Sequence, residues 1–167
     1  PAALTHFEDA ASVRRGLGPD EEDLLSLSLQ AVAACHRRQG NLEVALPLYH
    51  EVYELARGMP GAQRVVASVR NSLALCYMDL GDLAESIALF EAALGSAIDE
   101  YEQGHFNAGF LARSYSNLGF IYLEHGDLAH ALENADTGSE MLREAGLEEH
   151  REMMKLHTLQ AMIAWVR

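Results

Sequence analysis

The sequence lacks the features that mark secreted and membrane proteins. Its 167 residues include only two cysteines, too few for a disulfide scaffold and typical of a reducing compartment. It has no run of about 18 apolar residues that could span a bilayer. Its first residues lack the cationic and apolar parts of a secretory signal. These absences predict a soluble cytoplasmic protein that does not enter a membrane.

Basic residues are also scarce. Twelve lysines and arginines stand against twenty-five aspartates and glutamates, which gives a formal net charge of -13. A surface of this charge repels the phosphates of DNA and RNA, so we expect no nucleic-acid partner for this segment. With 49% hydrophobic residues and only four prolines, the composition indicates a globular domain with a packed core.

Signatures of catalysis are absent too. The sequence contains no phosphate-binding loop, no GxSxG motif, no dinucleotide-binding fingerprint and no CxxC pair. His125 and His130 flank one turn, but their spacing supplies no third metal ligand. We therefore predict surface histidines, no enzyme activity, no cofactor and no metal site. We likewise expect an exposed polar helix face around a second group: Glu149, His150, Glu152 and His157.

The sequence does contain a repeated segment. Three stretches align without gaps: LQAVAACHRRQGNLEVALPLY from Leu29, RNSLALCYMDLGDLAESIALF from Arg70 and YSNLGFIYLEHGDLAHALENA from Tyr115. Each has a Gly-(Asp/Asn)-Leu triplet at its centre. Glycine readily takes the positive φ that ends a helix, and Asp or Asn caps the helix that follows. Each copy therefore predicts a helix, a tight turn and a second helix.

Residues at fixed distances from the turn glycine have similar sizes in all three copies. The residue seven positions before the glycine is small, which lets the partner helix approach closely: Ala33, Ala74 and Gly119. The residue four positions before the glycine is His or Tyr: His36, Tyr77 and Tyr122. We expect His36 to be a packed imidazole with a hydrogen bond. Cys35 and Cys76 share one column. Stacked helices lie about 8–10 Å or more apart, too far for a disulfide, so both are predicted to be apolar fillers.

The pattern predicts about eight helices, near residues 2–15, 23–38, 42–57, 62–79, 83–101, 106–124, 128–145 and 149–166. We expect one domain over residues 1–167, with full repeats at 24–60, 62–104 and 106–146. Half repeats at 1–18 and 149–167 predict a piece of a longer protein. Aligning Phe7 with Phe90 makes the first segment similar to the second helix of a preceding repeat. Pro47 predicts a kink or a shortened helix, because it lies beyond the first turn.

These columns resemble the tetratricopeptide repeat (TPR), whose motif has a large residue, Leu-Gly, Tyr, a Gly-Asp turn, then Ala and an aromatic at helical spacing. The third copy matches at Tyr115, Leu118, Gly119, Tyr122, Gly126, Asp127 and Ala131. The period exceeds the usual length of about 34 residues, and is similar to the longer repeats of kinesin light chains and of peptide-sensing bacterial regulators. The resemblance implies an all-α fold, a right-handed α-solenoid of stacked antiparallel helix hairpins.

The resemblance also implies a peptide-binding groove formed by the first helices of the repeats. The candidate residues are those that the core columns leave free: Gln30, Arg37, Arg38, Asn71, Leu75, Met78, Arg113, Asn117, Phe120 and Glu124. Asn71 and Asn117 have both donors and an acceptor for a peptide backbone, although a solvated helix surface is an equal alternative for any single residue. An acidic chain with apolar groove residues favours a neutral or basic amphipathic helix as partner.

Two functions are therefore carried forward. The preferred one is a protein- or peptide-binding scaffold, and the alternative is a ligand-sensing regulatory domain of a larger transcription regulator or signalling protein. If the chain is complete, apolar residues of the last helix are left uncovered and predict a homo-oligomer formed through the terminal helices. Those residues are Met153, Met154, Ile163 and Trp165.

Overall fold

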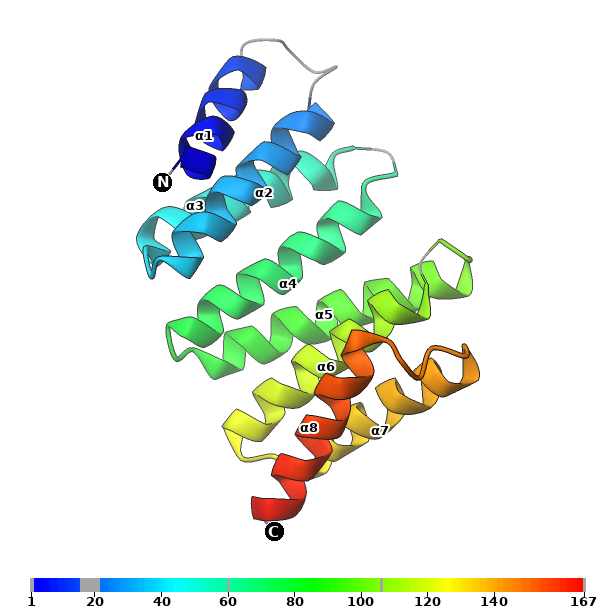
Figure 1. Ribbon diagram of the computed structural model, residues 1–167. Helices are drawn as coiled ribbons and strands as arrows, with labels where there is room; N and C mark the ends of the chain where they lie inside the picture. Colours follow the sequence, from blue (N-terminus) through cyan, green and yellow to red (C-terminus); the bar gives the residue numbers. More distant parts are fainter. Residues whose placement is uncertain (1, 16–21, 60, 106, 167) are drawn as a thin grey trace. The chain divides into compact units, whose positions relative to one another are not determined.

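The computed structural model describes residues 2–15, 22–59, 61–105 and 107–166, and this part of the chain forms eight helices without strands (Figure 1). The helices are α1 (Ala2–Arg15), α2 (Glu22–Arg38), α3 (Leu42–Arg57), α4 (Gln63–Asp79), α5 (Leu83–Glu102), α6 (Ala108–His125), α7 (Leu128–Glu144) and α8 (Arg151–Val166). Every predicted helix is present, with each end within two residues of its predicted position. The repeat boundaries predicted at residues 1, 18, 60, 106 and 167 lie outside the described residues.

The chain divides into two compact units, Pro1–Gly81 with helices α1 to α4 and Asp82–Arg167 with helices α5 to α8. In the first unit each helix packs against its neighbour in the sequence, and α2 also contacts α4. The second unit repeats this scheme, with α6 contacting α8 as well as α5 and α7. Each unit is therefore a stack of helices that are neighbours in the sequence.

The turn glycines behave as the sequence predicts. Gly40, Gly81 and Gly126 have φ of 79°, 82° and 84°, the left-handed region in which glycine is favoured. The following aspartates cap the next helix: an Asp82 side-chain oxygen accepts from the Glu85 N–H at 3.2 Å, and Asp127 accepts from the His130 N–H at 3.1 Å. The cap predicted at Asn41 is wrong, because its side chain accepts no hydrogen bond from α3.

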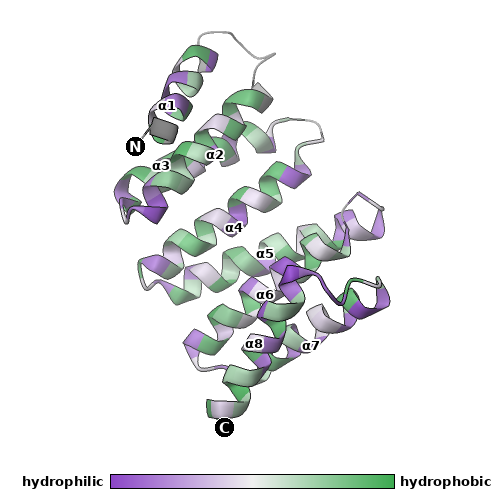
Figure 2. Ribbon diagram, viewed as in Figure 1, coloured by the Kyte–Doolittle hydropathy of each residue, from purple (hydrophilic) through white to green (hydrophobic). Residues whose placement is uncertain are grey.

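Small residues bring the helices together. Ala33, Ala45 and Ala74 are fully buried, and Gly119 lies so close to its neighbours that a Cβ there would be 2.5 Å from Leu159 Cδ2. Pro47 does not shorten its helix, since α3 continues to Arg57. Its exposed position lets water bind the carbonyl that loses an N–H partner. Hydrophobic and hydrophilic residues alternate along the helices (Figure 2), and none of the described helices is long and apolar enough to cross a membrane.

His36 is packed, as predicted, but the predicted hydrogen bond is missing. Its side chain is 14% exposed, and its Nε2 atom lies 3.7 Å from Glu8 Oε1, beyond hydrogen-bonding distance. Its buried Nδ1 atom has no hydrogen-bond partner among the described residues. Cys35 and Cys76 are free thiols. Burial raises the pKa of the Cys76 thiol to about 11, as expected for an apolar filler.

The last helix is covered more completely than the sequence suggests. Met153 and Ile163 are buried, at 3% and 1% exposure, so the prediction that they form an uncovered surface is wrong. Both point into clusters formed with residues of α6 and α7. Met154 and Trp165 lie on the other side of α8 and are 73% and 88% exposed. Adjacent residues of a helix point in different directions, which separates Met153 from Met154.

Candidate functional site

The first unit holds six of the predicted groove residues, on two helices that touch each other. The Arg37 guanidinium Nη1 lies 2.8 Å from Asp79 Oδ2 and so links α2 to the end of α4. Arg38 is exposed beside it. The six predicted residues therefore lie on two helices that are in contact within this unit: Gln30, Arg37, Arg38, Asn71, Leu75 and Met78.

Asn71 occupies a more enclosed position than its neighbours on α4. It is 7% exposed, while Leu75 and Met78 are half-buried. Neither polar atom of its side-chain amide has a hydrogen-bond partner within the described part of the chain. A buried amide without partners is unfavourable, because it has lost its hydrogen bonds to water.

The second unit holds the other four predicted residues, all on α6. Arg113, Asn117, Phe120 and Glu124 are spaced by four, three and four residues, which places them along one face of the helix. Asn117 is half-buried and Glu124 is exposed. Phe120 is partly buried against the cluster that contains Leu159 of α8, so its ring contributes to the core of this unit.

Arg113 is held by aromatic and acidic neighbours. Its guanidinium lies over the Phe110 ring, 4.7 Å from the centroid, a cation–π arrangement. Burial lowers the pKa of Arg113, and the nearby Glu152 carboxylate opposes this change. This arginine is thus positioned by contacts inside its own unit rather than extended freely into water.

Glu152 is buried, although the sequence predicts that it belongs to an exposed polar face. Its side chain is 1% exposed, so the expectation of an exposed polar face around it is wrong. Its carboxylate pairs with Arg151 Nε at 3.0 Å and with Lys155 Nζ at 2.9 Å. Lys155 follows Glu152 by three residues, a spacing that indicates an ion pair on the helix and could have been read from the sequence. His157 is exposed as predicted, and no group of three metal-ligating side chains occurs among the residues that the structure describes.

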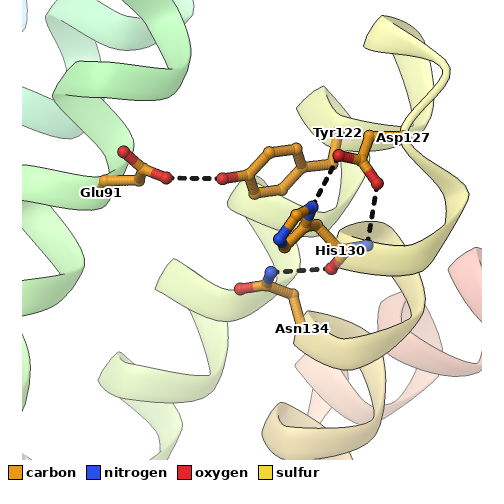
Figure 3. Close-up of polar contacts among 5 residues, drawn as sticks. All are labelled: Glu91, Tyr122, Asp127, His130 and Asn134. Atoms are coloured by element: carbon orange, nitrogen blue, oxygen red, sulfur yellow. Dashed lines mark hydrogen bonds and ion pairs between the residues drawn. The ribbon is translucent and has the colours of Figure 1, made fainter.

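The two histidines beside the Gly126 turn are at the surface, as predicted. His125 is exposed, and the His130 side chain is 56% exposed. His130 nevertheless has defined contacts, because its Nδ1 atom lies 2.6 Å from Asp127 Oδ2 and its ring stacks on Tyr122. The repeat pattern does not predict this cluster, which also includes Glu91 of α5 (Figure 3).

Repeated helix hairpins with small residues at their crossings define a helical-repeat protein, and two comparisons identify the kind of repeat. Family models described as tetratricopeptide repeat match residues 28–63 and 65–144. The chain belongs to the tetratricopeptide repeat family, and its fold is an all-α repeat of the solenoid class. TPR repeats are generally scaffolds that bind proteins or peptides, and they are typically not enzymes. A search of curated protein sequences finds no match.

Solved structures with the same fold differ widely from this chain in sequence. BtubC (BKLC) from P. vanneervenii has a TM-score of 0.81 at 16% identity, over 98% of this chain. The chain spans only 65% of the length of BtubC. A putative kinesin light chain from Podosopora anserina with nearly identical TPR-like repeats has a TM-score of 0.77 at 16% identity, over 97% of this chain and 76% of that one. The N-terminal domain of stress-induced protein-1 from C. elegans has a TM-score of 0.60 at 17% identity, over 86% of this chain and 99% of that one.

Proposed function

We propose that this chain is a scaffold that binds a protein or peptide along the first helices of its repeats, α2, α4 and α6. The repeats would lie at 24–60, 62–104 and 106–146, flanked by half repeats at 1–18 and 149–167. The observation that carries the proposal is the face of α6, where a charged residue, an amide and an aromatic ring follow one another at helical spacing: Arg113, Asn117, Phe120 and Glu124.

This face suits a helical or extended peptide. Phe120 offers apolar surface at the base, and the Asn117 amide offers two donors and an acceptor to a peptide backbone. In the first unit, Leu75 and Met78 are half-buried and would provide further apolar surface on α4. The net charge of -13 favours a neutral or basic partner.

The proposal is tested with a peptide selected from a displayed library of basic amphipathic helices. Its dissociation constant is measured by fluorescence anisotropy for the unmodified chain and for Asn117→Ala. The loss of the amide's hydrogen bonds should weaken binding on the order of tenfold. Asn41→Ala is the control, because the Asn41 side chain makes no capping hydrogen bond to α3 and lies on a turn. Equal affinity for the Asn117→Ala and Asn41→Ala variants would exclude α6 as the binding face.

A further inference from the structure

The second unit contains a cavity on a different side of α6 from the face described above. It has a volume of about 530 Å³ and is lined by residues of α5, α6 and α7. This volume lies within the range of about 300–1,000 Å³ that is usual for ligand pockets. Its polar and aromatic lining includes Glu91, Tyr115, Tyr122, His130, Glu133 and Asn134.

Contacts fix the positions of four of these side chains, Glu91, Tyr122, His130 and Asn134 (Figure 3). The Tyr122 hydroxyl donates to Glu91 Oε1 at 2.5 Å, a bond that joins α6 to α5. The His130 ring stacks on the Tyr122 ring with 5.1 Å between centroids and 25° between planes. On its other side, His130 is held by Asp127. The cavity wall is therefore organised before any ligand arrives, which lowers the entropic cost of binding.

Asn134 presents an acceptor without a donor. The residue is only 8% exposed, and its Nδ2 donates to the His130 carbonyl oxygen at 2.8 Å. That bond fixes the orientation of the amide, so the side-chain oxygen Oδ1 is turned away from the α7 backbone (Figure 3). No described residue donates a hydrogen bond to Oδ1, although Asn134 lines the cavity. Oδ1 is not one of the fully buried side-chain atoms that lack a partner, so it remains accessible to solvent, and a ligand in the cavity would replace water as its donor.

Apart from His130, which is a cation when protonated, the charged side chains that line the cavity are acidic. Its lining includes Glu91 and Glu133 but, among the described residues, neither Lys nor Arg. Burial, the hydrogen bond to Glu91 and the nearby carboxylates raise the pKa of Tyr122 to about 12. The hydrogen bond and charge of Asp127, followed by Glu133 and Glu91, raise the pKa of His130. Several carboxylates thus act on the same small volume.

The first unit contains the equivalent cavity, and it is apolar at three positions where the second is polar. Its volume is about 210 Å³. Its lining residues on α2 and α3 occupy the same repeat positions as those of the second cavity, and they lie 86 residues earlier in the sequence, as Gly40 lies 86 residues before Gly126. Leu29 replaces Tyr115, Val44 replaces His130 and Leu48 replaces Asn134. The repeat therefore forms this hollow with apolar side chains at these positions. The polar lining in the second unit is not required for packing.

We propose that the cavity between α5, α6 and α7 binds an ammonium or guanidinium group on an apolar stem, either a lysine or arginine side chain of a protein partner or a small free amine. The cation would donate hydrogen bonds to Asn134 Oδ1 and to the carboxylates. The Tyr115 ring, and the face of the Tyr122 ring that His130 does not cover, would interact with the cation. The methylene stem would pack on Leu94 and Ile98 at the rim.

The test uses three short peptides, acetyl-Ala-Ala-X-Ala-Ala-amide with X as lysine, arginine or the neutral norleucine, and the free amine n-butylammonium. Binding is followed by ¹H–¹⁵N NMR titration of the full chain. Lysine and arginine peptides should shift the amide signals of residues around the cavity, including His130 and Asn134, and norleucine should not. A tighter dissociation constant for the peptides than for n-butylammonium identifies a protein side chain as the source, and equal constants identify a free amine.

Two variants separate a specific site from general attraction to an acidic chain. Glu133→Gln should weaken binding of the lysine peptide on the order of tenfold, because it removes one charge-assisted partner. Glu144→Gln is the control, since Glu144 is exposed on the same helix outside the cavity. Asn134→Ala should also weaken binding, with circular dichroism used to check that it folds. Equal losses in Glu133→Gln and Glu144→Gln, or binding of the norleucine peptide as tight as that of lysine, would overturn the proposal.

Discussion

Gly119 provides a sharp test of the helix packing in the second unit. Replacing it with alanine removes the helix-weakening effect of glycine and should by itself stabilise α6 by about 1 kcal/mol. The new Cβ, however, would lie 2.5 Å from Leu159 Cδ2 and 3.2 Å from the Ala131 carbonyl oxygen. Leu159 is fully buried in a cluster with Ile163, and the Ala131 oxygen belongs to the backbone of α7. Neither group is free to move away.

The balance of the two effects decides the sign. Overfilling a packed core destabilises a protein by about 1–3 kcal/mol, so Gly119→Ala should be neutral to about 2 kcal/mol less stable than the unmodified chain. Gly95 offers the opposite case in α5, where a new Cβ meets nothing within 4 Å. Gly95→Ala should therefore stabilise the chain by about 1 kcal/mol. The difference in the free energy of unfolding between the two variants measures the cost of overpacking at Gly119. We expect about 1–3 kcal/mol, or about 2–12 °C in melting temperature.

Thermal unfolding followed by circular dichroism measures this difference directly. Both variants should have the helical spectrum of the unmodified chain at low temperature, which shows that the comparison concerns stability and not misfolding. The Gly119→Ala variant should melt below the Gly95→Ala variant. If Gly119→Ala melts at the same temperature or above it, the close approach of α6, α7 and α8 at this glycine is incorrect.

Three further measurements address the buried and titrating groups. The ion pair with Asp127 raises the pKa of His130 in the folded chain, so it stabilises the fold most below about pH 6.5 and less as the pH rises through the folded pKa. The loss of stability caused by His130→Asn should follow the same trend in urea unfolding measured between about pH 5.5 and 8.5. Glu152→Gln should lower the free energy of unfolding by about 1–3 kcal/mol, because it removes a buried charge from its basic partners, whereas the exposed control Glu149→Gln should change it by less than about 0.5 kcal/mol. Cys76, which is buried with a pKa of about 11, should react with a thiol reagent far more slowly than Cys35 in the folded chain and at a similar rate in urea.

The helices could be predicted from the sequence because their ends are set locally. Gly81 and Gly126 take a positive φ, and the aspartate after each one caps the next helix within three residues. Such signals need no knowledge of distant residues. The missing cap at Asn41 shows the limit of the pattern, since its amide nitrogen faces the Gln39 side chain at 3.4 Å instead.

The misplaced residues depend on distant partners. Glu152 is buried near Arg113, 39 positions away in the sequence, and the repeat pattern does not specify which polar residue of α8 faces α6. Met153 and Met154 show the same limitation, because helical periodicity predicts that they face different directions but not which of them is covered. The groove residues are known only as positions on one face of each first helix, and their role in binding remains a prediction.

The two cavities clarify what lack of recurrence means in a repeat protein. The contact between Tyr122 and Glu91 has a counterpart in the first unit, where His36 approaches Glu8 at the equivalent repeat positions, so this pair belongs to the stacking of successive hairpins. His130 and Asn134 have no polar counterpart. A residue that the repeat does not need for packing is free to vary. Because the polar residues that do not recur converge on one cavity, the same lack of recurrence favours a binding role that is specific to the second unit.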